Sequence, residues 1–372
     1  MEVWPISAHD RYDASAGDRT WSVPMAGSAR FSWDYADGRA RLLALYQQGK
    51  DKQWDAATRI DWSQEVDPHH PLGLSDRTVP IYGLPLWDKL GRRERGELRQ
   101  HLMAWQFSQF LHGEQGAMIC SARIVESVPD MDAKFYAATQ TIDETRHAEI
   151  YSRFLREKIG LLYPINPELR SLLETTLSDS RWDMPYLGMQ VLIEGLALAA
   201  FGVLRDAATA ALPKQILSYI MQDEARHVAF GRLALRDYYA QLSRRELDER
   251  EEFVVESCWL MRDRLRGAEV WENLGFDMDA CLAAVETSEY MRAFRKLLFS
   301  RIVPCVKDIG LWGERVRTAY ERMGVLELAG LDLAELMRRD ADIADGLDRT
   351  RAQEAEFARR REQVAETIAT AL

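Results

Sequence analysis

The middle of the chain carries apolar residues at the spacing of α-helices. Glycine and proline are scarce between about residue 95 and residue 260, and apolar positions recur there so that they share one helical face. The alternating apolar and polar pattern that indicates strands does not appear in this stretch. Four long helices are therefore predicted, over the approximate ranges Glu97–Val128, Met131–Ile159, Ser180–Leu212 and Pro213–Leu242.

The links between these segments indicate how the helices are arranged. A few residues join the first segment to the second and the third to the fourth, so each pair is predicted to form an antiparallel hairpin. The stretch Gly160–Asp179 between the pairs contains Pro164 and Pro167 and is long enough for a crossover. Two helical hairpins joined by one long crossover form the ferritin-like four-helix bundle. The predicted fold class is therefore all-α.

The regions on either side of the bundle are expected to pack onto it. Residues 1–94 are less regular and rich in tryptophan, so we expect them to wrap around the bundle. Residues 243–372 again have helical spacing and are predicted to form further helices, which cap the bundle or pack against a partner chain. Because no domain boundary is evident, we predict a single domain over residues 1–372 with its core bundle at about 95–242.

Composition and charge narrow the class of protein. Apolar residues make up 47% of the chain and charged residues 29%, which is typical of a soluble globular protein. The net charge of −11 and the lack of a basic stripe argue against nucleic acid as a partner. The chain has no basic start followed by an apolar core and no run of 18 apolar residues. We therefore expect neither a signal peptide nor a membrane span, and a cytoplasmic location.

A five-residue motif occurs twice, as Asp-Glu-Thr-Arg-His at Asp143–His147 and as Asp-Glu-Ala-Arg-His at Asp223–His227. In each copy the glutamate and the histidine are three residues apart, so they share one face of a helix. A carboxylate and an imidazole on one face can bind the same metal ion. A single Glu-x-x-His often arises by chance, whereas two copies inside predicted helices indicate a metal site.

Two further glutamates complete the pattern. Glu194 is the only charged residue in the apolar stretch Met189–Leu204, and Glu114 has the matching place in the first segment. Burying an unpaired carboxylate costs on the order of several kcal/mol, a cost that a bound metal would remove. The first glutamate of each hairpin precedes the motif glutamate by 30 residues, and the two halves repeat at 80 residues. The set predicted to surround one point is Glu114, Glu144, His147, Glu194, Glu224 and His227.

The alternative is a set of buried ion pairs in which Arg146 and Arg226 neutralise the glutamates. That alternative does not explain six residues in register across four helices. A histidine that binds metal usually donates its other ring N–H to a carboxylate. We therefore predict that Asp143 and Asp223 each hold the histidine of the opposite hairpin, and that the arginines hold these aspartates.

The donor set indicates the metal. Four carboxylates and two imidazoles without a thiolate disfavour structural zinc. Four negative charges offset two divalent ions and can bridge them. We predict two iron ions, with manganese as an alternative at one position. Catalytic as well as metal-binding roles are assigned to Glu114, Glu144, Glu194 and Glu224.

With these motifs the sequence resembles the ferritin-like di-iron carboxylate superfamily. This superfamily includes ribonucleotide reductase small subunits, the hydroxylase subunits of bacterial multicomponent monooxygenases, and the arylamine N-oxygenases. The resemblance covers roughly residues 95–240 and implies O2 activation at a di-iron centre with the six residues as ligands. The stretch Leu45–Trp62 is also similar to a segment of relatives of these oxygenases.

Departures from the family patterns bear on the choice within the superfamily. Tyr151 lies four residues after the first motif histidine, where the reductases have their radical tyrosine. Many reductases, however, have Asp where this chain has Glu114, and the C-terminal Ala-Glu-Thr-Ile-Ala-Thr-Ala-Leu has no tyrosine to relay a radical. The arylamine N-oxygenases have a third histidine one turn before the second Glu-x-x-His. Here that residue is Ile220, which argues against close identity with that group.

Small residues beside the lone glutamates predict a substrate pocket. Ala117 and Ala197 lie about one turn from Glu114 and Glu194 and would leave room over the metals. The other pocket candidates are Phe110, Leu111, Met118, Tyr151, Gln190, Val191 and Leu198. Such a lining indicates an apolar or aromatic molecule rather than a sugar or a nucleotide.

From the sequence we expect a non-haem di-iron monooxygenase that hydroxylates or N-oxygenates a small organic substrate with O2 as co-substrate. Electrons are expected from a separate reductase or ferredoxin, because no flavin or nicotinamide fingerprint is present. A homodimer is expected. Two alternatives stay open: a reductase-like subunit that stores a radical on Tyr151, and a non-catalytic metal-binding scaffold.

Overall fold

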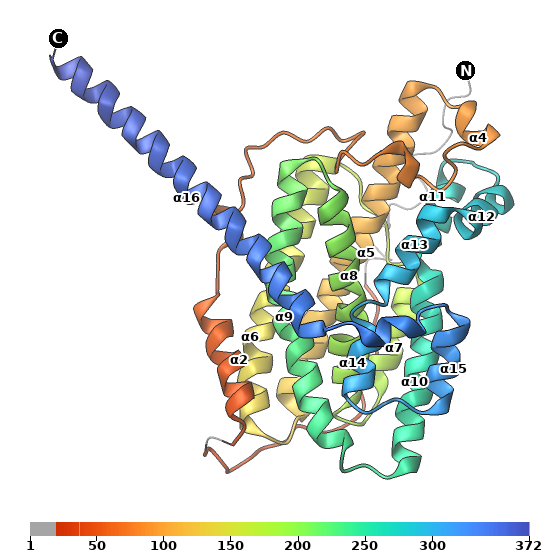
Figure 1. Ribbon diagram of the computed structural model, residues 1–372. Coiled ribbons are helices and arrows are strands. Elements are labelled where there is room, and N and C mark those ends of the chain that lie inside the picture. The colour runs from red at the N-terminus through yellow and green to blue at the C-terminus, as the bar shows by residue number, and fades with distance from the viewer. Residues whose placement is uncertain (1–19, 37, 372) are drawn as a thin grey trace.

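The computed structural model describes residues 20–36 and 38–371, and every regular element in that part is helical. Four helices lie side by side in the centre (Figure 1): α5 (Arg92–Ser127), α6 (Met131–Phe154), α8 (Glu194–Ala207) and α9 (Ala211–Tyr239). α5 packs against α6, and α8 packs against α9, so both predicted hairpins are present. The prediction of an all-α, ferritin-like bundle is confirmed.

Side-chain caps explain where the first two helices begin. The Asp130 carboxylate accepts a hydrogen bond from the backbone N–H of Ala133 and caps α6 directly after Pro129. At the start of α5 the Glu94 carboxylate accepts a hydrogen bond from the N–H of Gly91. Each cap satisfies an N–H group that has no partner within its helix. These helices therefore begin within a few residues of the predicted positions.

The third segment differs from its prediction. In place of one helix over Ser180–Leu212, a π-helix, η3 (Tyr186–Ile193), runs directly into α8, which ends before Ala208. The backbone N–H of Glu194 bonds to the carbonyl of Met189, five residues back, as in the wider turns of a π-helix. An apolar α-helix and an apolar π-helix have the same composition, so the pattern does not separate them. Glu194 is thus the first residue of α8, directly after η3.

The crossover between the hairpins is partly helical, which the sequence pattern did not indicate. The helix α7 (Pro167–Ser178) begins where the Asn166 side chain accepts a hydrogen bond from the N–H of Leu169. Before it, a second π-helix, η2 (Leu155–Ile159), extends α6 and ends at Gly160, whose φ of 78° is in the left-handed region. α7 contacts α5 and η3 and so covers one side of the bundle.

The segment before the bundle packs along it. α2 (Ala40–Asp51) contacts α6 and α9, and α3 (Ala56–Arg59) contacts α6. Two short elements follow, η1 (Asp76–Thr78) and α4 (Pro85–Asp88). The predicted wrapping is confirmed from residue 20 onward, whereas the first 19 residues of the predicted segment lie outside the described part.

The region after the bundle is helical, as predicted. Its elements are α10 (Arg244–Asp263), η4 (Arg264–Arg266), α11 (Ala268–Asn273), α12 (Met278–Thr287), α13 (Glu289–Leu298), α14 (Ile302–Asp308), α15 (Glu314–Arg322), η5 (Leu326–Gly330) and α16 (Leu333–Ala371). α13 packs on α8, and α10 packs on α7 and η3. Figure 1 shows that α16, which contacts α9, continues well beyond the bundle.

One helical stretch in the described part is long and apolar enough to cross a membrane, which the sequence expectation did not include. This stretch, Tyr186–Ala207, combines η3 and α8. In the structure, 83% of its most apolar window is buried inside the protein. Its apolar composition is thus accounted for by its place in the centre of the bundle.

Candidate metal centre

The six residues predicted to surround one point come together inside the bundle. All four bundle helices contribute to the cluster, and each of its residues is at most 4% exposed. The set comprises Glu114 on α5, Glu144 and His147 on α6, Glu194 on α8, and Glu224 and His227 on α9.

The possible ligand atoms of this cluster form two overlapping groups, within each of which the atoms lie no more than 4.8 Å apart. The first group consists of Glu114, Glu144, His147 and Glu224. The second group consists of Glu144, Glu194 and His227. Glu144 is the one residue that belongs to both groups, so it lies between two possible metal positions.

Both imidazole rings turn the same nitrogen toward the carboxylates. His147 Nδ1 lies 3.1 Å from Glu224 Oε1 and 3.3 Å from Glu114 Oε2. His227 Nδ1 lies 3.0 Å from Glu144 Oε1. The centroids of the two rings are 6.0 Å apart. A metal ion among the carboxylates would therefore meet Nδ1 of each histidine.

Several buried atoms of the cluster have no hydrogen-bond partner. These atoms are Glu144 Oε2, Glu194 Oε2, Glu224 Oε2 and His227 Nδ1. Leaving a buried polar group without a partner costs about 1–3 kcal/mol, and more for a charged group. Carboxylate oxygen and imidazole nitrogen are ligands that suit iron and manganese. The side chains present thus fit a pair of such ions.

The second nitrogen of each histidine faces an aspartate of the other hairpin. His147 Nε2 lies 3.2 Å from Asp223 Oδ2, and His227 Nε2 lies 3.3 Å from Asp143 Oδ2. When Nε2 carries the proton and donates it to the aspartate, Nδ1 is left to bind a metal. The crossed pairs also link the two hairpins to each other.

Two arginines hold both aspartates. Arg146 Nη2 donates to Asp143 and, at 3.0 Å, to Asp223. Arg226 Nη2 donates to Asp223 at 2.6 Å and to Asp143 at 3.4 Å. All four residues are at most 7% exposed. Their two positive and two negative charges offset one another, so the arginines do not neutralise the glutamates of the cluster.

The loop before α3 covers the aspartates. The Trp54 indole Nε1 donates to Asp223 at 2.8 Å, and Gln53 Nε2 donates to Asp143 at 2.8 Å. Arg146 donates to Gln53 Oε1 at 2.9 Å and lies over the Trp54 ring, 4.8 Å from its centroid. No metal-binding motif marks Gln53 or Trp54, but both lie in the stretch 45–62 that is similar to relatives of these oxygenases.

The metal-free cluster holds more protons than its residues would hold in water. Burial raises the pKa of Glu114 and of Glu194 well above the usual value, and neighbouring carboxylates add to the effect. For Glu144, burial alone would raise the pKa, but the charge of His227 and the nearby ring nitrogens of both histidines outweigh it and lower the pKa. Burial opposes charge on the imidazoles, but the surrounding carboxylates prevail and raise the pKa of His147 and His227. Without bound cations, these pKa shifts favour proton binding by the cluster.

We predict that metal-free protein loses stability as the pH rises from about 5 to about 8. The carboxyls of Glu114 and Glu194 and both cluster histidines have raised pKa values, so the folded state binds more protons than the unfolded chain in this window. The free energy of unfolding then falls by up to about 1.4 kcal/mol per pH unit for each extra proton. Thermal unfolding in a chelator at several pH values measures this trend.

Metal-loaded protein is the control for this pH dependence. Bound cations replace the extra protons, so the fall in melting temperature should become much smaller. A melting temperature of the metal-free protein that rises over the same window would contradict the protonation pattern.

The predicted pocket residues lie next to the cluster but are closely packed. The rings of Phe110 and Tyr151 are 5.9 Å apart, and that of Phe201 lies 4.7 Å from Phe110. Ala117 is 2% exposed, and Ala197 packs against the apolar core. Neither alanine lines any of five cavities found in the described part of the chain. A pocket over these alanines therefore stays a prediction.

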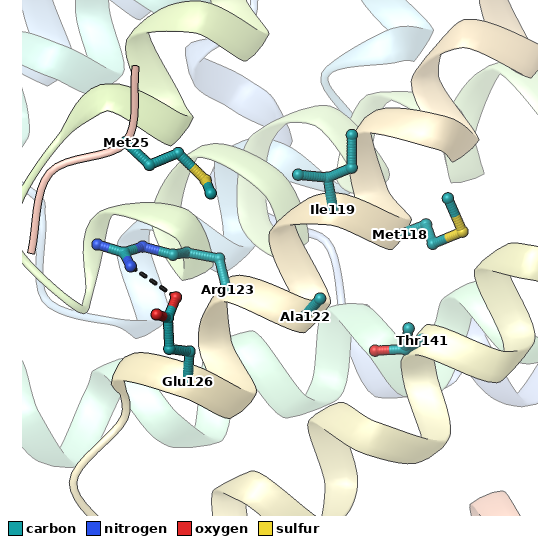
Figure 2. A pocket seen from close by; sticks show the side chains of 7 residues that line it. All are labelled: Met25, Met118, Ile119, Ala122, Arg123, Glu126 and Thr141. Carbon is teal, nitrogen blue, oxygen red and sulfur yellow. Dashed lines mark hydrogen bonds and ion pairs between the residues drawn. The ribbon is translucent and has the colours of Figure 1, made fainter. Parts of the chain in front are cut away.

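Met118, another predicted pocket residue, faces the outside of the bundle. It lines a surface groove of about 380 Å³ between α5, α6 and the extended segment around Met25. Figure 2 shows this groove with the ion pair between Arg123 and Glu126 at one end. Among the remaining candidates, Gln190, Val191 and Leu198 are fully buried, and Leu111 lines a second surface cavity.

One family model matches the chain over residues 36–310, and its description is P-aminobenzoate N-oxygenase AurF. The matched range contains the six cluster residues, the aspartates and arginines beside them, and the stretch 45–62. No curated protein matches the chain closely enough to count as a relative.

The chain is also similar to solved structures of R2-like ligand-binding oxidases. One is a mutant with an anaerobically reconstituted Mn/Fe cofactor, at 17% identity and a TM-score of 0.46, covering 73% of this chain and 94% of that chain. Another has an aerobically reconstituted metal cofactor after photoconversion, at 15% identity and a TM-score of 0.42, covering 71% of this chain and 99% of that chain.

Proposed function

This chain belongs to the P-aminobenzoate N-oxygenase AurF family, and from that membership we propose that it transfers an oxygen atom from O2 to the nitrogen of a small aromatic amine. As a member of the family it is a di-iron oxygenase that acts on a small organic molecule. We further propose which residues hold the metals and from which side the substrate approaches, and that the substrate is oxidised at its nitrogen.

The observation that supports the proposal most is the set of buried carboxylate oxygens without hydrogen-bond partners, on Glu144, Glu194 and Glu224. We assign the two ligand groups to two metal ions, with Glu144 shared between them. Such a donor set leaves few protein ligands for each ion. Room therefore remains for O2 and substrate at the metals, which is what an oxygenase needs and a structural site does not.

Family membership corrects one expectation from the sequence. Ile220, at the place of a third histidine in arylamine N-oxygenases, argued against close identity with that group, yet the family match extends across this position. The Ile220 side chain is fully buried and offers no ligand atom. Position 220 therefore adds no seventh ligand to the six residues that we propose hold the metals.

When bound, a pair of iron ions supplies the electrons that reduce O2 and the Lewis acidity that directs it to the substrate. The side chains of the protein neutralise the charge of the ions and orient the ligands. The glutamates balance the charge of the ions, while Asp143 and Asp223 keep each histidine turned with Nδ1 inward. The aromatic layer of Phe110, Tyr151 and Phe201 keeps water from one side of the centre.

We place the substrate on the side of this aromatic layer. Burial is the largest cause of the raised pKa of Tyr151, and the charges of Glu114 and Glu224 raise it further. The Tyr151 ring is therefore close to the first ligand group. An aromatic substrate can stack or pack edge-on against these rings. A separate reductase or ferredoxin as electron donor, and a second copy of the chain as partner, stay predictions.

Radical storage on Tyr151 is the alternative that its position suggests. Its hydroxyl is buried and has no hydrogen-bond partner in the described part of the chain, so no neighbour stands ready to take its proton. We predict that Tyr151→Phe keeps both metals and stays within about twofold of wild-type activity, which is less than about 0.5 kcal/mol in activation free energy. Metal analysis and O2 consumption measure this. Loss of activity with both metals bound would favour the reductase-like function.

The proposed function is tested by a single turnover. Protein loaded anaerobically with two ferrous ions per chain is mixed with labelled ¹⁸O2 and p-aminobenzoate as the probe amine. We expect rapid O2 consumption and a product that carries the label on nitrogen, and no product with the Glu194→Ala variant. Ferrous protein that does not react with O2 would exclude an oxygenase. Reaction with O2 without labelled product would exclude arylamines of this kind as substrates.

A further inference from the structure

Gln140 joins two glutamates of the centre that come from different hairpins. Its Nε2 donates to Glu144 Oε1 at 2.9 Å and to Glu194 Oε1 at 2.8 Å. The Gln140 side chain is fully buried, on α6 one turn before Glu144. Both N–H groups of this amide therefore donate to carboxylate oxygens, and no water is needed to satisfy them.

The corresponding position in the other half of the bundle has no such donor. The cluster residues repeat at 80 residues, so the residue that corresponds to Gln140 is Ile220. Ile220 is equally buried, but it cannot donate a hydrogen bond. The cluster therefore has approximate twofold symmetry in its six inner residues and in the aspartates and arginines beside them, and it loses that symmetry at Gln140 and Ile220.

A second amide supports Gln140 on the same side. Gln190 Nε2 donates to Gln140 Oε1 at 3.4 Å, which turns the NH2 group of Gln140 toward the carboxylates. Gly231 makes space for Gln190, because a Cβ at Gly231 would lie 2.5 Å from Gln190 Cβ. At the same repeat, the residues corresponding to Gln190 and Gly231 are Phe110 and Tyr151. At these two positions one half of the centre thus has an amide and a glycine, and the other half has two aromatic rings.

We propose that Gln140 is a positioning residue that makes the two metal positions unequal. It holds Oε1 of Glu194, and Oε2 of Glu194, which has no hydrogen-bond partner in the described part of the chain, is left to bind a metal together with Glu144 and His227. No hydrogen bond joins Gln140 to Glu114 or Glu224 in the described part of the chain, and these two belong only to the first group. The inference rests on the proposed dinuclear centre.

Gln140 can have this effect because two carboxylate oxygens accept hydrogen bonds from its one amide nitrogen. Glu144 Oε1 and Glu194 Oε1 both lie within 2.9 Å of one nitrogen, so the amide is what keeps two carboxylate oxygens close together. Without its N–H groups, the carboxylates repel each other in a buried site, and Glu194 is free to turn away. We expect Glu194 rather than Glu144 to move away from the second metal position, because Glu144 also contacts His227, 3.0 Å away.

The test is metal binding by Gln140→Met, which keeps the length of the side chain and removes its donors. Metal-free protein is titrated with Mn²⁺, and bound and free ions are counted by electron paramagnetic resonance. We expect wild type to bind two ions per chain. The variant should bind one with unchanged affinity and the other about 10–100-fold more weakly. At one equivalent, its spectrum should be that of an isolated ion rather than of a coupled pair.

Ile220→Met is the matched control, since it places a methionine at the corresponding position of the other half without removing a donor. Both ions should remain tightly bound in this variant. Wild-type affinity at both positions in Gln140→Met would make Gln140 a packing residue, and equal weakening at both would refute the inequality. If Gln140→Met does not fold, Gln190→Leu, which releases the Gln140 amide, should weaken the same single ion. Fewer than two ions in wild type would overturn the dinuclear centre itself, a result distinct from both.

Discussion

Replacing Glu144 with alanine is expected to abolish tight binding of both metal ions, whereas replacing Glu194 with alanine should remove only one. Glu144 belongs to both ligand groups, and Glu194 belongs only to the second. Both residues are at most 3% exposed, so a difference between them does not reflect burial. Metal content after anaerobic loading and gel filtration measures the effect. Oxygenase activity should be lost in both variants, because one ion alone cannot supply the electrons for O2.

Glu149→Ala is the matched control for these two variants. Glu149 lies on α6 like Glu144 but is exposed on its outer face, and its removal should change neither metal content nor activity. Glu144→Ala protein that keeps one ion tightly would show that Glu144 is not shared. Glu194→Ala protein that loses both ions would show that the first group cannot hold a metal by itself.

Asp223→Asn is expected to weaken metal binding about 10–100-fold without unfolding the protein. Asp223 accepts from His147 Nε2, Trp54 Nε1 and both neighbouring arginines. An asparagine keeps the size but loses the charge, and its NH2 group cannot accept a hydrogen bond. The Nε2 of His147 then has a weaker partner. As a result, the imidazole is no longer held with its proton on Nε2 and with Nδ1 free to bind a metal. Calorimetric titration with Mn²⁺ measures the affinity.

Asp223→Ala should, in addition, be strongly destabilising. It leaves Arg146 and Arg226 buried with only Asp143 to balance two positive charges. Removing one partner of a buried ion pair costs about 3–5 kcal/mol. Asp237→Ala is the control on the same helix, since the Asp237 side chain is 62% exposed and its ion pair with Arg39 should contribute little. Equal melting temperatures of the two variants would contradict the role given to the buried network.

The six cluster residues could be predicted because their positions follow from regular spacing in the sequence. Residues three apart share a helical face, and two hairpins of equal length bring the glutamates at matching intervals to one level of the bundle. Glu194 stood out because it is the one charge in an apolar helix, where burial without a partner is costly. The pairs of Asp143 and Asp223 with the histidines follow from the chemistry of a metal-bound imidazole, whose other N–H is usually donated to a carboxylate.

The next layer could not be predicted, because it depends on contacts between distant segments. Trp54 reaches Asp223 across 169 residues of sequence, and neither residue signals the other. Gln140 has no motif of its own, and its role appears only once Glu144 and Glu194 are seen on either side of one amide. The π-helix before Glu194 has the composition of any apolar helix, so its wider turns leave no trace in the pattern.

The most direct test of the dinuclear centre is a crystal of anaerobically iron-loaded protein, measured with X-rays on both sides of the iron absorption edge. We predict two anomalous peaks per chain, about 3.5–4 Å apart, as in other two-metal sites. Both should lie beside Glu144, one next to Nδ1 of His147 and the other next to Nδ1 of His227. A single peak at full loading, or peaks away from these residues, would contradict the centre described here.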